Sequence, residues 1–88
     1  MKSSFTIPED VVSRTVRGEE VLLNLKTSHY FGLDSIGTLV WSALKKKQGL
    51  DQMVELVCAE YDAKPELVRK DILALLSKMK AKGLLTEN

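Results

Sequence analysis

Residues that could attack a substrate or hold a metal are scarce in this chain of 88 residues, which contains one histidine, His29, and one cysteine, Cys58. Nucleophilic catalysis needs a nucleophile with a base oriented beside it. Cys58 falls on the apolar stripe of a predicted helix, where a thiol packs as a small hydrophobic group. One histidine and one cysteine supply too few ligands for a structural zinc site, and no glycine-rich phosphate loop occurs. The sequence therefore predicts no catalytic residue, no metal site and no cofactor.

Backbone pairing is the chemistry that the segment His29–Leu33, HYFGL, can offer. An edge strand presents free N–H and C=O groups to a second chain. The segment contains no proline and no Lys, Arg, Asp or Glu, and Gly32 allows close approach of another backbone. Alternation places Phe31 and Leu33 on one face, with Leu33 toward the core, and Tyr30 with Gly32 on the other. A short apolar strand can also simply fill its own core, which is the preferred interpretation from these residues alone.

Three short segments before residue 34 have the composition of strands. They cover Val11–Arg17, Glu20–Leu25 and His29–Leu33 and are separated by the polar turns at Gly18 and Lys26. β-Branched and apolar residues dominate them. Strands joined by such short turns form an antiparallel meander.

Helical periodicity replaces the strand pattern after Leu33. Apolar residues from Ile36 to Leu44 recur at helical spacing behind an N-cap at Asp34 or Ser35, and two further helices are predicted at about 51–61 and 65–82. Segregated strands and helices indicate an α+β fold, here a winged-helix-like arrangement of a three-stranded antiparallel sheet followed by three α-helices. Residues 1–88 are predicted to form a single domain, with loose ends at 1–4 and 87–88.

The third predicted helix has two shoulders beside its core stripe. The stripe is formed by Val68, Ile72, Leu75 and Met79. One shoulder carries Arg69, Leu73, Leu76 and Lys80, and the other carries Leu67, Asp71 and Lys78. Leu73 lies where a solvated helix favours a polar residue, which is compatible with a groove on that side. Single exposed leucines are common, however, and the choice of shoulder stays open.

The order and spacing of these residues resemble the PqqD-like family, also called RiPP recognition elements. The similarity covers residues 5–85, and its best-matching parts are Arg17–Leu44 and Val68–Leu85. The family pattern matches here at Gly18, Leu22, Leu23, Asn24, Tyr30, Phe31, Gly32, Leu33, Gly37, Val40 and Trp41. Asp34 stands where the family usually has Asn, a change that keeps the capping ability of the side chain.

The resemblance implies a peptide-binding adaptor without catalysis. Such proteins bind the leader segment of a ribosomally made precursor peptide and present it to a modifying enzyme, such as a lasso-peptide leader peptidase or a radical enzyme of pyrroloquinoline quinone assembly. The leader adds as a strand beside the third strand and lies against the third helix, which reverses the preference for a core strand at 29–33. The expected leader-binding residues are His29, Tyr30, Phe31, Gly32, Leu33, Val68, Arg69, Ile72, Leu73 and Leu76.

Two other functions agree less well with the sequence. A winged-helix DNA-binding protein is the main alternative, but the net charge of +1 argues against a nucleic-acid partner. A small-molecule carrier ranks last, because so short a chain leaves little room for a pocket. No apolar run is long enough for a membrane helix, and the single cysteine suits a cytoplasmic protein. A homodimer formed through the same free edge remains open.

Overall fold

The computed structural model describes residues 5–87 and contains the predicted antiparallel meander. Strands β2 (Val11–Val16), β3 (Glu19–Asn24) and β4 (Tyr30–Gly32) pair in the order β2-β3-β4. In this register Val12 pairs with Leu23, and Leu23 pairs with Tyr30. The predicted third strand is correct in place and is shorter by one residue at each end. β3 is therefore the central strand, and β2 and β4 are the edges.

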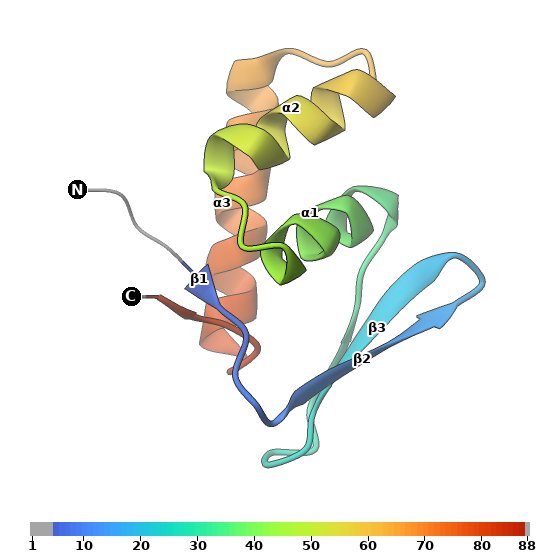
Figure 1. Cartoon of the computed structure of the whole chain (residues 1–88), viewed down its shortest axis with the longest axis vertical. Coiled ribbons are helices and arrows are strands. Elements are labelled where there is room, and N and C mark those ends of the chain that lie inside the picture. The colour runs from blue at the N-terminus through green and yellow to red at the C-terminus, as the bar shows by residue number, and fades with distance from the viewer. Residues whose placement is uncertain (1–4, 88) are drawn as a thin grey trace.

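Three helices follow the sheet, so the predicted α+β fold is confirmed. They are α1 (Ser35–Lys45), α2 (Leu50–Glu60) and α3 (Pro65–Ala81), and α3 runs behind α1 and α2 in Figure 1. The Asp34 carboxylate caps α1 by accepting a hydrogen bond of 2.8 Å from the Gly37 N–H. Pro65 occupies the first turn of α3, where its missing N–H costs nothing.

A second, two-stranded sheet joins the two ends of the described chain. Strand β1 (Phe5–Thr6) pairs antiparallel with β5 (Thr86–Glu87), to one side of α3 (Figure 1). The prediction of a loose end at Glu87 is wrong, because this residue pairs with Phe5 and accepts a 2.9 Å hydrogen bond from Lys80 Nζ. Residues 1–4 and 88, also predicted to be loose, lie outside the described residues.

The hydrophobic core lies between the inner face of the sheet and the three helices. Trp41 of α1 is 2% exposed and Leu22 of β3 is fully buried. Tyr61, the residue after α2, is 39% exposed, because the helix ends at Glu60 and the chain is extended there. Core packing thus holds β3 and α3 in place, and β4 lies beside β3 at the edge of the sheet.

Candidate functional site

β4 pairs with β3 on one side and with no other strand of residues 5–87 on its second side. The Leu33 N–H donates to the Glu20 carbonyl at 2.8 Å, and the Asn24 N–H donates to the His29 carbonyl at 2.9 Å. Backbone groups alternate in direction along an antiparallel strand. His29 and Leu33 direct their backbone groups toward β3, and Phe31 therefore does the same. The N–H and C=O groups of Tyr30 and Gly32 consequently point away from the sheet. Two residues thus offer a complete set of donors and acceptors to an added strand.

The side chains along β4 leave this edge accessible. Tyr30 is 75% exposed, and a Cβ built on Gly32 would meet nothing within 4 Å. Phe31 is half-buried and pairs with the buried Leu22, so it faces the helices, while Leu33 is buried. The predicted division of β4 into an inner face and an outer face is therefore confirmed.

The C-terminal end of α3 forms the wall opposite this edge. A pocket of about 610 Å³ lies between the two, and its lining comprises Thr27, Ser28, His29, Tyr30, Ala81, Lys82 and Gly83. Lys82 Nζ lies over the Phe31 ring, 5.9 Å from its centroid. The free edge and the last turn of α3 therefore bound one groove, which we call the β4–α3 groove.

The structure assigns this groove to the shoulder of α3 that carries Lys82. Arg69 forms an ion pair with Asp51 at the start of α2, and Lys80 reaches Glu87 of β5. Both cations of the shoulder that contains Leu73 are thus paired with other elements, and the expectation that Arg69 and Leu73 bind a leader stays a prediction.

The opposite shoulder carries Asp71, Leu75 and Lys78 at helical spacing from Lys82. The pocket itself is lined from this side by Ala81, Lys82 and Gly83. Val68, Ile72 and Leu76 were also expected to contact a ligand, but they are at most 6% exposed and belong to the core. Their contribution is to seat α3, and any contact with a ligand would be indirect.

Asn24 holds the two walls of the groove together, a role that sequence reasoning did not assign. Its Nδ2 donates to the Gly83 carbonyl at 2.8 Å, and its Oδ1 accepts from the N–H groups of Lys26 and Thr27 at 2.9 and 3.1 Å. Asn24 thereby links the turn before β4 to the end of α3. Gly83 has φ +75°, and a Cβ there would approach Asn24 Nδ2 at 3.3 Å. The available signal was an asparagine at the end of an apolar strand.

Replacing Asn24 is expected to loosen both walls. Asn24→Ala removes the side-chain bonds of a residue that is 6% exposed, and the free energy of unfolding should fall by about 2–3 kcal/mol. Asn24→Asp keeps the two acceptor bonds but turns the donor to Gly83 into an acceptor, so it should also destabilise the protein. Urea unfolding measures both effects. Equal stability of wild type and Asn24→Ala would contradict this role.

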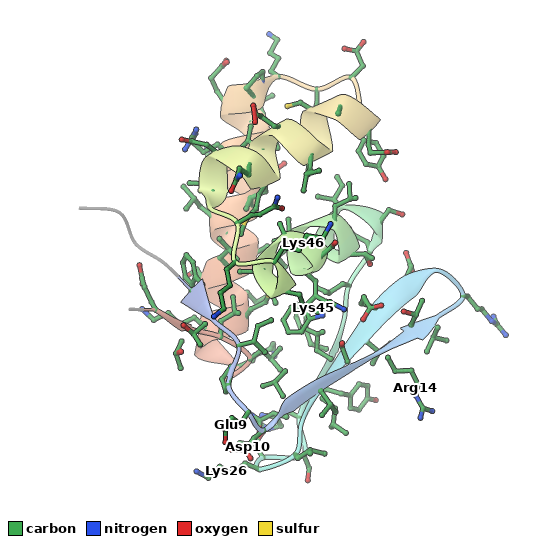
Figure 2. The ribbon with its side chains drawn as sticks, viewed as in Figure 1. Glu9, Asp10, Arg14, Lys26, Lys45 and Lys46 are labelled. Carbon is green, nitrogen blue, oxygen red and sulfur yellow. The ribbon has the colours of Figure 1, made fainter. Side chains whose placement is uncertain are left out.

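The outer face of the sheet is apolar and turned away from the helices. It is formed by Val12, Arg14 and Val16 of β2, Val21 and Leu23 of β3, and Tyr30 of β4. Val12 and Val16 are 43% and 46% exposed. Arg14 projects from this face away from the helices (Figure 2). We call this surface the outer sheet face, and it shares Tyr30 with the β4–α3 groove.

Two other kinds of site are absent from residues 5–87. No group of three His, Cys, Asp or Glu side chains there is placed to hold a metal ion. In the same residues no helix combines the length and apolar character needed to cross a membrane.

Comparisons with known proteins show which proteins this chain resembles. The family model described as "Coenzyme PQQ synthesis protein D (PqqD)" matches residues 19–85. The fold is similar to that of TbiB1 in complex with the TbiA(beta) leader peptide, with a TM-score of 0.86, 38% identity, and coverage of 91% of this chain and 93% of that one. A lasso peptide synthetase B1 complexed with the leader peptide has the same fold, with a TM-score of 0.87, 19% identity, and coverage of 94% and 98%. A search of the curated proteins gives no significant match.

Proposed function

Because this chain belongs to the PqqD family, we propose that it is a peptide-binding adaptor that captures the leader segment of a ribosomally synthesised precursor peptide. The 38% identical relative is a complex with a leader peptide, and its match spans 91% of this chain. The proposal extends that kind of ligand to the β4–α3 groove described above.

The outward backbone groups of Tyr30 and Gly32 are the observation that carries this function. An extended peptide placed there antiparallel to β4 would continue the sheet and satisfy its own backbone groups at the same time. Its inward side chains would meet Phe31 and the Lys82 shoulder of α3. Strand addition gives affinity through the backbone and specificity through the pockets for alternate side chains.

We propose that the outer sheet face receives the modifying enzyme, such as the leader peptidase of a lasso-peptide pathway. A leader strand on β4 would add a fourth strand to this same face, so an enzyme bound there would contact adaptor and leader together. The exposed valines supply apolar contact area, and Arg14 would pair with a carboxylate of the enzyme. The adaptor itself needs no catalytic group for this role.

Binding of a labelled peptide and of DNA distinguishes the proposed function from its main alternative. The peptide is the TbiA(beta) leader, which is bound by the 38% identical relative. We expect saturable anisotropy changes with this leader that weaken little between low and moderate salt. A DNA-binding protein would instead bind a duplex with a steep loss of affinity as salt rises. Duplex binding without leader binding would overturn the proposal.

A further inference from the structure

A lysine lies at one end of the β4–α3 groove. Lys82 sits in the pocket wall near His29, and its Nζ lies over the Phe31 ring, 5.9 Å from the centroid. The lining of this pocket includes no Asp or Glu among the described residues. The groove is therefore basic at the end near His29.

An antiparallel guest strand would place one inward side chain at this end of the groove. The guest residue opposite Phe31, called x here, points inward, as do residues x−2 and x+2 opposite Leu33 and His29. Residue x would pack on the half-buried Phe31 ring. Residue x+2 would enter the pocket beside Lys82.

Resting on the proposed function, we propose that this groove selects leaders by their residues at two inward positions: apolar at x and acidic at x+2. Lys82 is the specificity-determining residue for the acidic position. Its ammonium lies over the Phe31 ring and its side chain lines the pocket that residue x+2 would enter. The same cation would disfavour Lys or Arg at x+2.

A phage-displayed library of random short peptides, selected on the whole protein, tests this pattern. We expect enriched peptides to carry Asp or Glu two residues after an apolar residue. Selection on Lys82→Glu should retain the apolar preference and exchange the acid for Lys or Arg. Lys70→Glu makes the same charge change at an exposed position on the far side of α3 and should leave the selection unaltered. An enriched wild-type peptide should bind Lys82→Glu about tenfold more weakly at low salt, and the difference should shrink as salt rises.

The outcomes separate the two proposals. Enrichment of peptides that depend on Gly32 but show no acid preference, or no exchange with Lys82→Glu, overturns the charge pattern and leaves strand addition standing. Failure to enrich any peptide, or equal enrichment on a Gly32→Pro variant, overturns strand addition itself.

Discussion

Gly32→Pro is expected to abolish leader binding, weakening it by about 100-fold or more, since it removes a backbone donor from the docking edge and places a ring there. The Gly32 N–H points away from β3, so the substitution breaks no bond of the protein's own sheet. Proline is tolerated at such edge positions, and the site is open to an added side chain. Phe31→Pro is a poorer test, because the Phe31 N–H faces β3 and its loss would damage the sheet.

Ser13→Pro is the matched control for this experiment. Ser13 lies on β2, the other edge of the same sheet, and it pairs with Leu22 of β3. The Leu25 N–H donates to the Asp10 carbonyl at 2.8 Å, and the alternation from that bond directs the Ser13 N–H away from the sheet. Calorimetric titration with the TbiA(beta) leader should therefore show loss of binding for Gly32→Pro and wild-type affinity for Ser13→Pro. Retained affinity in a folded Gly32→Pro variant would exclude strand addition at β4.

The position and the two faces of the third strand were predictable from the sequence, whereas the helix face opposite it was not. The alternation of HYFGL predicts a strand with Tyr30 outward and Leu33 inward, but these residues alone favoured a core strand, and only the family resemblance favoured an edge. The apolar stripe of α3, in contrast, has two shoulders, and its periodicity alone does not say which shoulder adjoins β4. Tertiary contacts decide this: the pair Arg69–Asp51 marks one side and Lys82 over Phe31 marks the other.

The other features that the sequence did not predict depend on very short strands or on contacts between residues far apart in the chain. β1 and β5 contain two residues each, too few to show an alternation, and they pair across almost the whole chain. Asn24 and Gly83 are 59 residues apart, so the bond that closes the groove leaves no local pattern. Local sequence thus predicts the third strand, whereas the depth and polarity of the groove depend on how α3 packs against the rest of the protein.

The second large effect is expected at the outer sheet face. The double variant Val12→Glu with Val16→Glu should leave leader affinity within about threefold of wild type, because both side chains are on the face opposite Phe31 and are already partly exposed. Stimulation of precursor processing by the modifying enzyme should fall by about 100-fold, because two carboxylates would be desolvated in an apolar interface. The measurement is the rate of leader removal by a lasso-peptide leader peptidase, as a function of adaptor concentration.

A double variant on α3 separates loss of docking from a general effect of added charge. Leu73→Glu with Ser77→Glu introduces the same two carboxylates at exposed positions of α3, away from both the outer sheet face and the Lys82 shoulder. It should support processing at the wild-type rate. Arg14→Glu should weaken docking of the enzyme and leave leader affinity unchanged, because Arg14 projects from the outer sheet face. Undiminished processing with the double valine variant would mean that the enzyme recognises the leader strand or another surface, and that the apolar outer sheet face serves a different contact.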